Sequence, residues 1–175
     1  MEKYTRESER LIFRVLTEDN LEDFYNILKI DDVGKWLLTG RGKTWEETLA
    51  KIHLYTDNFN ELGYGPWGVF EKESGELIGQ SGLMPTEDGH IGLVYSFHPD
   101  VWYQGYGSES CELALKYGFT ELGVDHIVAY IRPENARSFH VVEKCGLTQT
   151  ELRDFKGVLM MGFEITREDW LKKHK

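Results

Sequence analysis

Features that would place this chain in a specialised class of proteins are scarce. Among its 175 residues there are only two cysteines, Cys111 and Cys145. They are too few and too isolated to predict a disulfide framework or a thiolate zinc site, so no metal is expected. The four prolines occur singly, and no repeat, low-complexity tract or linker-like stretch divides the sequence. We therefore predict one continuous domain over residues 1–175.

Long apolar segments are also missing. Residues 1–7 lack the apolar core of a secretion signal, and no apolar run approaches the roughly 18 residues that a membrane-spanning helix needs. The sequence thus predicts a cytoplasmic protein that does not enter a membrane.

Basic residues are in the minority. There are 20 lysines and arginines against 30 aspartates and glutamates, which gives a formal net charge of -10. No run of basic residues forms a local stripe, so nucleic-acid binding is not expected. An acidic surface would favour the approach of cationic ligands such as amines, although it also serves solubility alone.

The sequence does contain the alternating patterns of an α/β protein. Residues 11–15 predict a first strand, and Thr17 can cap a helix that follows it. A capping box at residues 44–47 opens a second helix, which ends near residues 63–66 because this Gly-Tyr-Gly-Pro stretch cannot continue a helix. The side chains predicted to point inward from the second helix are Trp45, Leu49, Ile52 and Phe59.

Further along the chain, paired strands are predicted at residues 67–71 and 76–83, with a turn at residues 73–75 between them. The full order predicts a mixed α/β fold with helices on both faces of a central sheet. The remaining predicted elements are a strand at 91–97, a helix at 107–122, a strand at 126–131, a helix that Asn135 caps and Gly146 ends, strands at 147–152 and 158–165, and a short helix from Thr166.

The segment between residues 97 and 109 carries the clearest functional signal, because it places Gly105 and Gly107 between a strand and the start of a helix. Glycines let the backbone approach a phosphate closely, and the free N–H groups and dipole of a helix N-terminus complement its charge. The stretch has neither the Gly-x-x-x-x-Gly-Lys-Ser/Thr pattern of nucleotide hydrolases nor the third glycine of a dinucleotide fingerprint. A pyrophosphate of another ligand fits better, although two glycines can also simply turn the chain.

This segment resembles the acetyl-CoA signature of the GNAT superfamily of N-acetyltransferases, usually written Arg/Gln-x-x-Gly-x-Gly/Ala. Trp102 takes the first position here, and that departure is similar to the Rim-type branch, which includes the ribosomal-protein N-terminal acetyltransferases. The resemblance extends over nearly the whole chain, through residues 75–79, 132–138 and 143–147. The residues that match the Rim-type segment Pro-x-x-Trp-x-x-Gly-Tyr-Gly/Ala-x-Glu are Pro99, Trp102, Gly105, Tyr106, Gly107 and Glu109.

The resemblance implies a GNAT-like fold, in which a mixed, mainly antiparallel sheet has one splayed pair of parallel strands. Here these are the strands that end near Phe97 and Ile131, and acetyl-CoA would lie between them. Main-chain groups of Phe97 would then bind the pantetheine arm, and Asn135 would touch it from the other side, although helix capping alone also explains Asn135. The amides implied to receive the pyrophosphate are those of Gln104, Gly105, Tyr106, Gly107 and Ser108.

Acetyl transfer needs a neutral amine and a proton donor for the leaving thiolate. Many GNAT enzymes carry a tyrosine acid where this chain has Val142. The Rim-type alternative is a serine three residues beyond the asparagine, here Ser138, which is the candidate catalytic acid; an ordinary first-turn serine is the other interpretation. Gly92 replaces the carboxylate that often acts as a base, and His90, His98 or a water relay could substitute.

The sequence therefore predicts an acetyl-CoA-dependent N-acetyltransferase that acts on a primary amine, either a small molecule or a protein N-terminus, by direct attack in a ternary complex. The alternative is a non-catalytic acetyl-CoA-binding sensory or regulatory module, because the usual tyrosine and carboxylate are missing. The sequence does not identify the acceptor. It also leaves the oligomeric state open, although proteins that it resembles are often homodimers.

Overall fold

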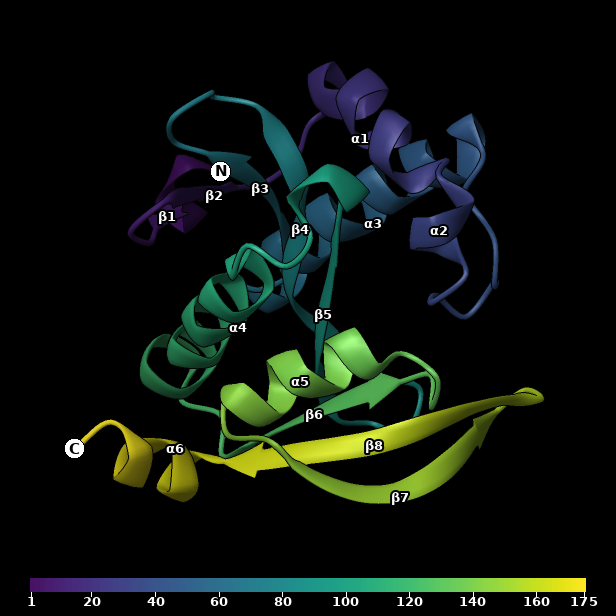
Figure 1. The fold of residues 1–175 in the computed structure, drawn as a ribbon. Helices are drawn as coiled ribbons and strands as arrows, with labels where there is room; N and C mark the ends of the chain where they lie inside the picture. Colours follow the sequence, from purple (N-terminus) through teal and green to yellow (C-terminus); the bar gives the residue numbers. More distant parts are fainter.

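A computed structural model describes all residues, Met1 to Lys175, and its centre is an eight-stranded sheet (Figure 1). All neighbouring strands are antiparallel except one parallel pair, so the predicted mixed, mainly antiparallel sheet is confirmed. The strands are, in spatial order, β1 (Arg6–Glu7), β2 (Leu11–Arg14), β3 (Pro66–Glu71), β4 (Leu77–Pro85), β5 (Ile91–Phe97), β6 (His126–Ile131), β8 (Val158–Thr166) and β7 (Thr148–Phe155).

Three helices lie between β2 and β3: α1 (Leu21–Leu28), α2 (Asp31–Gly34) and α3 (Trp45–Leu62). The predicted capping box opens α3, since Thr44 and Glu47 each bind the other's main-chain N–H through their side chains, over 3.1 and 2.8 Å. The prediction that Trp45 points inward is wrong. Its side chain is 42% exposed because it occupies the outer side of the first turn, where it packs edge-on against Tyr25. The side chains that α3 does bury are Thr48, Ile52, Tyr55 and Phe59.

The remaining helices follow the later strands. They are α4 (Tyr106–Lys116), which continues as a π-helical stretch to Leu122, α5 (Ala136–Lys144) and α6 (Arg167–Lys173). The chain has no helix that combines the length and the apolar character needed to cross a membrane.

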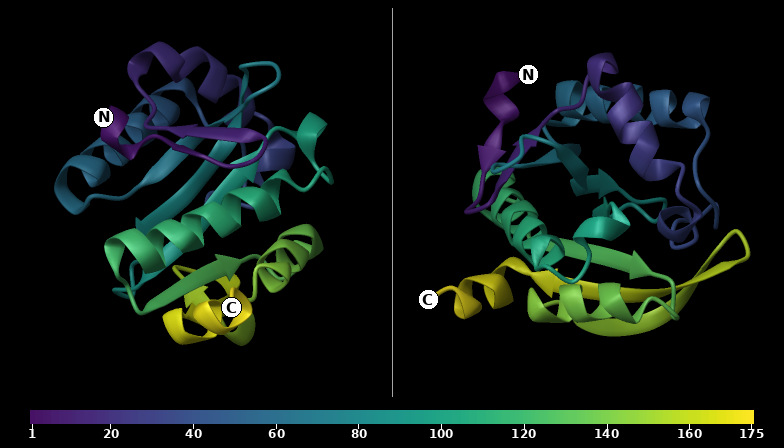
Figure 2. Two further views of the ribbon diagram at one scale, coloured as in Figure 1. Left: turned by 90° about the vertical axis from the view of Figure 1, so that its left-hand side faces the viewer. Right: turned by 45° about the horizontal axis from the view of Figure 1, so that its top comes forward.

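Helices cover both faces of the sheet because neighbouring residues of one strand point to opposite sides. In β2, Leu11 and Phe13 pack into the larger apolar cluster, which α4 shares, whereas Ile12 packs against the smaller cluster, which contains residues of α1, α2 and α3. Figure 2 shows the strands β3–β5 between the helices α1–α3 and the helix α5.

The parallel pair of strands is joined at one point only. β5 and β6 are in register at Gly92 and Val128 alone, although β5 pairs with β4, and β6 with β8, along most of their lengths. Beyond that point the two strands separate, and their C-terminal ends at Phe97 and Ile131 have no partner across the gap. The predicted splayed pair is thus present, and it opens a space in the middle of the sheet.

Candidate active site

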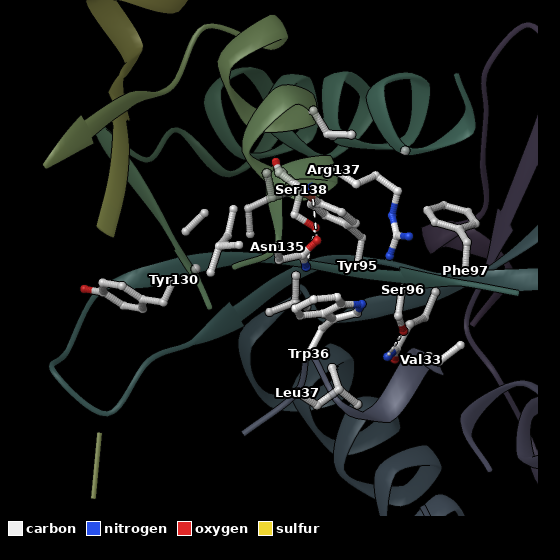
Figure 3. Close-up of a pocket in the computed structure, with 18 of the residues that line it drawn as sticks. Val33, Trp36, Leu37, Tyr95, Ser96, Phe97, Tyr130, Asn135, Arg137 and Ser138 are labelled. Carbon is white, nitrogen blue, oxygen red and sulfur yellow. Dashed lines mark hydrogen bonds between the residues drawn. The ribbon is translucent and has the colours of Figure 1, made fainter. Parts of the chain in front are cut away.

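A cavity of about 1080 Å³ occupies the opening between β5 and β6, and its volume suits a small-molecule site. Its walls come from β4, β5, β6, the segment between α2 and α3, α3 itself, the start of α4, and α5, and Figure 3 shows part of this lining. Most of the residues predicted from the sequence to form the site line this one cavity. They are Phe97, Gly105, Tyr106, Gly107, Ser108, Asn135 and Ser138.

The start of α4 borders one end of the cavity. Gly105 has the left-handed conformation, with φ of +83°, which a residue without a side chain adopts without strain. The first-turn N–H groups of Tyr106, Gly107 and Ser108 have no partner within the helix, so this end can bind an anion. Gln104 lies outside the cavity lining, and its side-chain amide donates to the carbonyl oxygen of Asp100 over 3.0 Å.

The main chain of β5 offers further groups to the gap. His98 N, directly after β5, donates to the carbonyl oxygen of Ile78 in β4 over 2.9 Å, so His98 and Ile78 form a hydrogen-bonded pair. In an antiparallel ladder such pairs alternate with pairs whose main-chain groups point away from the partner strand. The main-chain N–H and C=O groups of Phe97 and Tyr95 therefore point away from β4, toward β6.

Trp102 and Arg137 lie beside these groups, and the sequence had assigned neither a role. The indole N–H of Trp102 donates to the carbonyl oxygen of Phe97 over 2.8 Å, which fixes the end of β5 and occupies part of that carbonyl's capacity. The guanidinium carbon of Arg137 lies 3.5 Å from the centre of the Trp102 ring, a cation–π contact. A tryptophan at the position where Arg or Gln is usual was the available signal for this pair.

Asn135 and Ser138 form a buried pair at the start of α5 (Figure 3). The Oδ1 atom of Asn135 accepts from Ser138 N over 3.3 Å, which caps the helix, and its Nδ2 atom donates to Ser138 Oγ over 2.9 Å. Because Ser138 Oγ accepts this bond, its own hydrogen stays available for donation to a ligand.

Tyr95 of β5 contacts the Asn135–Ser138 pair from across the gap. Its hydroxyl donates to the carbonyl oxygen of Ser138 over 3.2 Å. Burial raises the pKa of Tyr95 well above its usual value of 10.0, so this phenol is neutral at physiological pH. Val142, which holds the place of the usual tyrosine acid, is buried in the larger apolar cluster and lines no part of the cavity.

The two histidines considered as a base are absent from the cavity wall. His98 Nδ1 accepts the main-chain N–H of Asp100 over 3.1 Å. His90 stacks edge-on against His126, with 5.6 Å between their ring centres. The only histidine that lines the cavity is His140 of α5, whose side chain is exposed. No group of three or more His, Cys, Asp or Glu side chains could hold a metal ion.

The opposite wall carries polar groups that sequence reasoning missed. Tyr55 donates to Gln80 Oε1 over 2.7 Å, and Gln80 Nε2 donates to Ser96 Oγ over 2.8 Å. Lys51 Nζ donates to the hydroxyl of Tyr55 over 3.3 Å and is the first donor in this series of hydrogen bonds. Trp36, which Figure 3 shows across the cavity from Asn135 and Ser138, has a buried indole N–H without a partner.

A split pair of strands, a helix start with free main-chain N–H groups and a buried serine hydroxyl thus lie in one cavity. Residues 10–148 match the acetyltransferase (GNAT) domain family, and the chain belongs to that family. It is accordingly an acyltransferase. The chain is 26% identical, over 142 residues, to a Bacillus subtilis (strain 168) protein named uncharacterized N-acetyltransferase YoaA, and the match covers 80% of each chain.

Two solved structures with the same fold concern named acceptors. A spermidine N-acetyltransferase from Vibrio cholerae, in complex with CoA and spermine, superposes with a TM-score of 0.77 at 19% identity, over 94% of this chain and 99% of that one. A ribosomal-protein-S5-alanine acetyltransferase from Vibrio fischeri gives a TM-score of 0.77 at 14% identity, over 95% and 98%. At these identities both likenesses show the shared fold.

Proposed function

We propose that this protein transfers the acetyl group of acetyl-CoA to a primary amine by direct attack in a ternary complex. The observation that carries the proposal is the single cavity that joins the start of α4 to the hydroxyl of Ser138 through the gap between β5 and β6. A ligand with an anionic end and a long neutral arm fits that path. The solved neighbour that contains CoA supports the choice of ligand.

The residues at the α4 end suit the phosphates of CoA. The free amides of Tyr106, Gly107 and Ser108 supply hydrogen-bond donors, and the helix dipole supplies partial positive charge. Arg137 and Lys144 line the same end from α5, and neither forms an ion pair with a carboxylate. These two cations would neutralise phosphate charge that the acidic surface otherwise repels.

The middle of the path suits the pantetheine arm. Its amide groups need main-chain partners, and Tyr95 and Phe97 direct theirs into the gap. The carbonyl oxygen of Phe97 is already bound by Trp102, so the N–H of Phe97 and the main-chain groups of Tyr95 are the freer partners. Asn135 borders the gap from α5.

Acetyl-CoA supplies an activated acetyl thioester. Ser138 Oγ–H is the proton donor for the departing thiolate, because its oxygen is oriented by Asn135 Nδ2 and its hydrogen is not otherwise engaged. The serine oxygen then regains a proton from solvent, which in the end also takes up the proton released by the amine. Tyr95 holds the main chain of Ser138 and, as a neutral phenol, takes up no proton itself. Because His90 and His98 do not line the cavity, the remaining acceptors for the amine proton are water and His140, the one histidine in the cavity wall.

Calorimetry with acetyl-CoA and a thiol-release assay with a panel of amines test this function. We expect micromolar-range binding and turnover with at least one amine. Binding without turnover of any amine would instead support the sensory or regulatory module. Absence of binding would reject both functions.

A further inference from the structure

The cavity differs in charge from the rest of the protein. The chain carries a formal net charge of -10, yet Glu87 is the only carboxylate in the cavity wall, and that carboxylate pairs with Lys156 over 3.3 Å. The cavity must therefore favour anionic ligands over cationic ones. The basic side chains that line it are Lys43, Lys51, Arg137 and Lys144.

These four cations form two pairs at different places. Arg137 and Lys144 belong to α5, beside the proposed phosphate end. Lys43 lies in the segment before α3, and Lys51 lies in the second turn of α3. Figure 2 shows the strands β4 and β5 between α3 and α5. A bound CoA accounts for the α5 pair. Lys43 and Lys51 would then have no negative charge of bound CoA beside them.

Lys43 and Lys51 also lack anionic partners within the protein. Lys43 Nζ donates to the hydroxyl of Thr39 over 3.0 Å, and Lys51 Nζ donates to that of Tyr55 over 3.3 Å. Glu47 lies near Lys43, but both of its carboxylate oxygens are bound by Arg41, over 2.7 and 3.0 Å. Burial and, next, the charge of Lys51 lower the pKa of Lys43, and the opposing effect of the Glu47 charge is smaller.

The neighbouring polar groups add donors rather than acceptors. In the chain Lys51–Tyr55–Gln80–Ser96, each side chain donates to the next. Ser96 Oγ accepts the last of these bonds, so its hydrogen is free to donate into the cavity. The indole N–H of Trp36 in the same wall is also unpartnered. Ammonium, hydroxyl and indole donors together complement a group that only accepts hydrogen bonds.

We propose that the acceptor is a primary amine that also carries an anionic group, a carboxylate or a phosphate, and that Lys43 and Lys51 bind this group. The inference rests on the proposed acetyl transfer and specifies its substrate class. With CoA bound to the α5 pair, a polyamine would meet the positive charges of Lys43 and Lys51 and one paired carboxylate, so polycations are poor acceptors. The acceptor class therefore differs from that of the spermidine enzyme with the same fold.

Pairs of acceptors of equal length test the proposal through thiol release. The first set compares 4-aminobutyrate with butylamine, and 6-aminohexanoate with hexylamine. O-phosphoethanolamine provides the phosphate arm, peptides that begin Ser-Asp-Glu or Ser-Lys-Lys provide the protein N-terminus arm, and spermidine is the polycation. We expect at least one acceptor that carries an anionic group to exceed its counterpart without that group in kcat/KM by about tenfold or more, which is typical of a charge-assisted hydrogen bond.

Charge-removing variants assign the preference to the two lysines. In Lys43→Met and Lys51→Met the ratio of kcat/KM between the acceptor with the anionic group and its counterpart without that group should fall toward one. Lys43→Arg should retain most of the preference. Lys116→Met removes an equal charge from an exposed site outside the cavity, and the ratio should not change. Removing a partly buried cation that has no anionic partner should not lower the melting temperature.

A binding measurement separates this inference from the proposed function. The preferred anionic amine is titrated calorimetrically into the protein without acetyl-CoA, where no turnover occurs, and its affinity should fall about tenfold in each Met variant. Turnover of the simple alkyl amines or of spermidine at equal or higher kcat/KM would overturn the inference while the acetyltransferase function stands. Lack of turnover with every amine would reject the function, and the titration would still decide whether the lysines bind an anion.

Discussion

The hydroxyl of Tyr95 in β5 donates a hydrogen bond to the carbonyl oxygen of Ser138 in α5, over 3.2 Å. This bond crosses the opening of the sheet at the point where β5 and β6 have already separated. It ties the strand whose main chain faces the gap to the helix that carries the proposed proton donor. The two sides of the cavity are thereby held in a fixed relation.

Replacing Tyr95 by Phe should remove this tie. We expect a loss of about 1 kcal/mol in the free energy of unfolding, corresponding to a fall of about 2–4 °C in melting temperature, together with a lower kcat. Tyr117→Phe is the matched control, because Tyr117 also donates to a main-chain oxygen, that of Gly63, away from the cavity. Equal effects of the two variants on kcat would show that the Tyr95 bond has no part in organising the site.

Ser138→Ala tests the proton donor. The variant keeps the helix and the cavity but removes the Oγ–H, so kcat should fall about 100-fold or more, while the dissociation constant of acetyl-CoA changes little. Ser110→Ala removes a buried serine hydroxyl from α4, outside the cavity, and should leave kcat near the wild-type value. Unaltered turnover in Ser138→Ala would leave Ser138 with a structural role only.

Gly105→Ala tests the anion-binding turn. Gly105 and Gly123 both have left-handed backbone conformations, with φ of +83° and +69°. An alanine at either position should cost about 1–2 kcal/mol of stability. Gly105 lines the cavity and Gly123 does not, so only Gly105→Ala should also weaken acetyl-CoA binding in calorimetry. Equal affinities of the two variants would contradict a phosphate site at this turn.

Glu109 anchors the turn from behind. It accepts hydrogen bonds from Ser8 Oγ, Arg10 N and Arg10 Nε, over 2.6 to 2.7 Å, and Arg10 in turn donates to the carbonyl oxygen of Gln104 over 2.9 Å. The matched Rim-type glutamate thus links the N-terminal hairpin to the proposed phosphate-binding turn. Burial acts to raise the pKa of Glu109, but the hydrogen bonds outweigh it, and the pKa lies below its usual value of 4.5.

The lowered pKa fixes the sign of a pH effect. A carboxyl group whose pKa is depressed by folding stabilises the protein above its unfolded pKa, and the contribution is lost as pH falls through the folded value. Glu109→Gln should therefore cost about 1–3 kcal/mol at pH 7, and the difference in melting temperature should shrink below pH 4.5. Thermal unfolding at pH 7, 5 and 3 measures this; a constant difference would refute this link.

Much of the fold could be predicted because its signals are local. The limits of β5 and β6 agree with the predicted strands, and α3 begins at its predicted capping box. The two-residue strand β1 and the four-residue helix α2 were missed, since elements this short show no periodicity. Trp45 was misplaced because position in a capped first turn, rather than apolar character, decides which way that side chain points.

The sequence predicted the candidate site best where the geometry is set by residues that are close together in the chain. The glycine turn and the Asn135–Ser138 pair are of this kind, because three or four residues set their geometry. The histidines suggested as bases were chosen by residue type, and the fold directs them elsewhere. Lys43, Lys51 and Trp36 carry no motif, since an unpaired lysine in the sequence does not differ from a surface lysine.

The sequence by itself determined the order of strands and helices, the caps, and the backbone of the anion-binding turn, because each depends on interactions within a few residues. The tertiary structure alone decided which side chains meet across the open sheet. It brought Tyr95 to Ser138, more than 40 residues apart, and it placed the cations of α3 and α5 in one cavity of an acidic protein. Charge inside a cavity depends on which residues enclose it, and that is a property of packing.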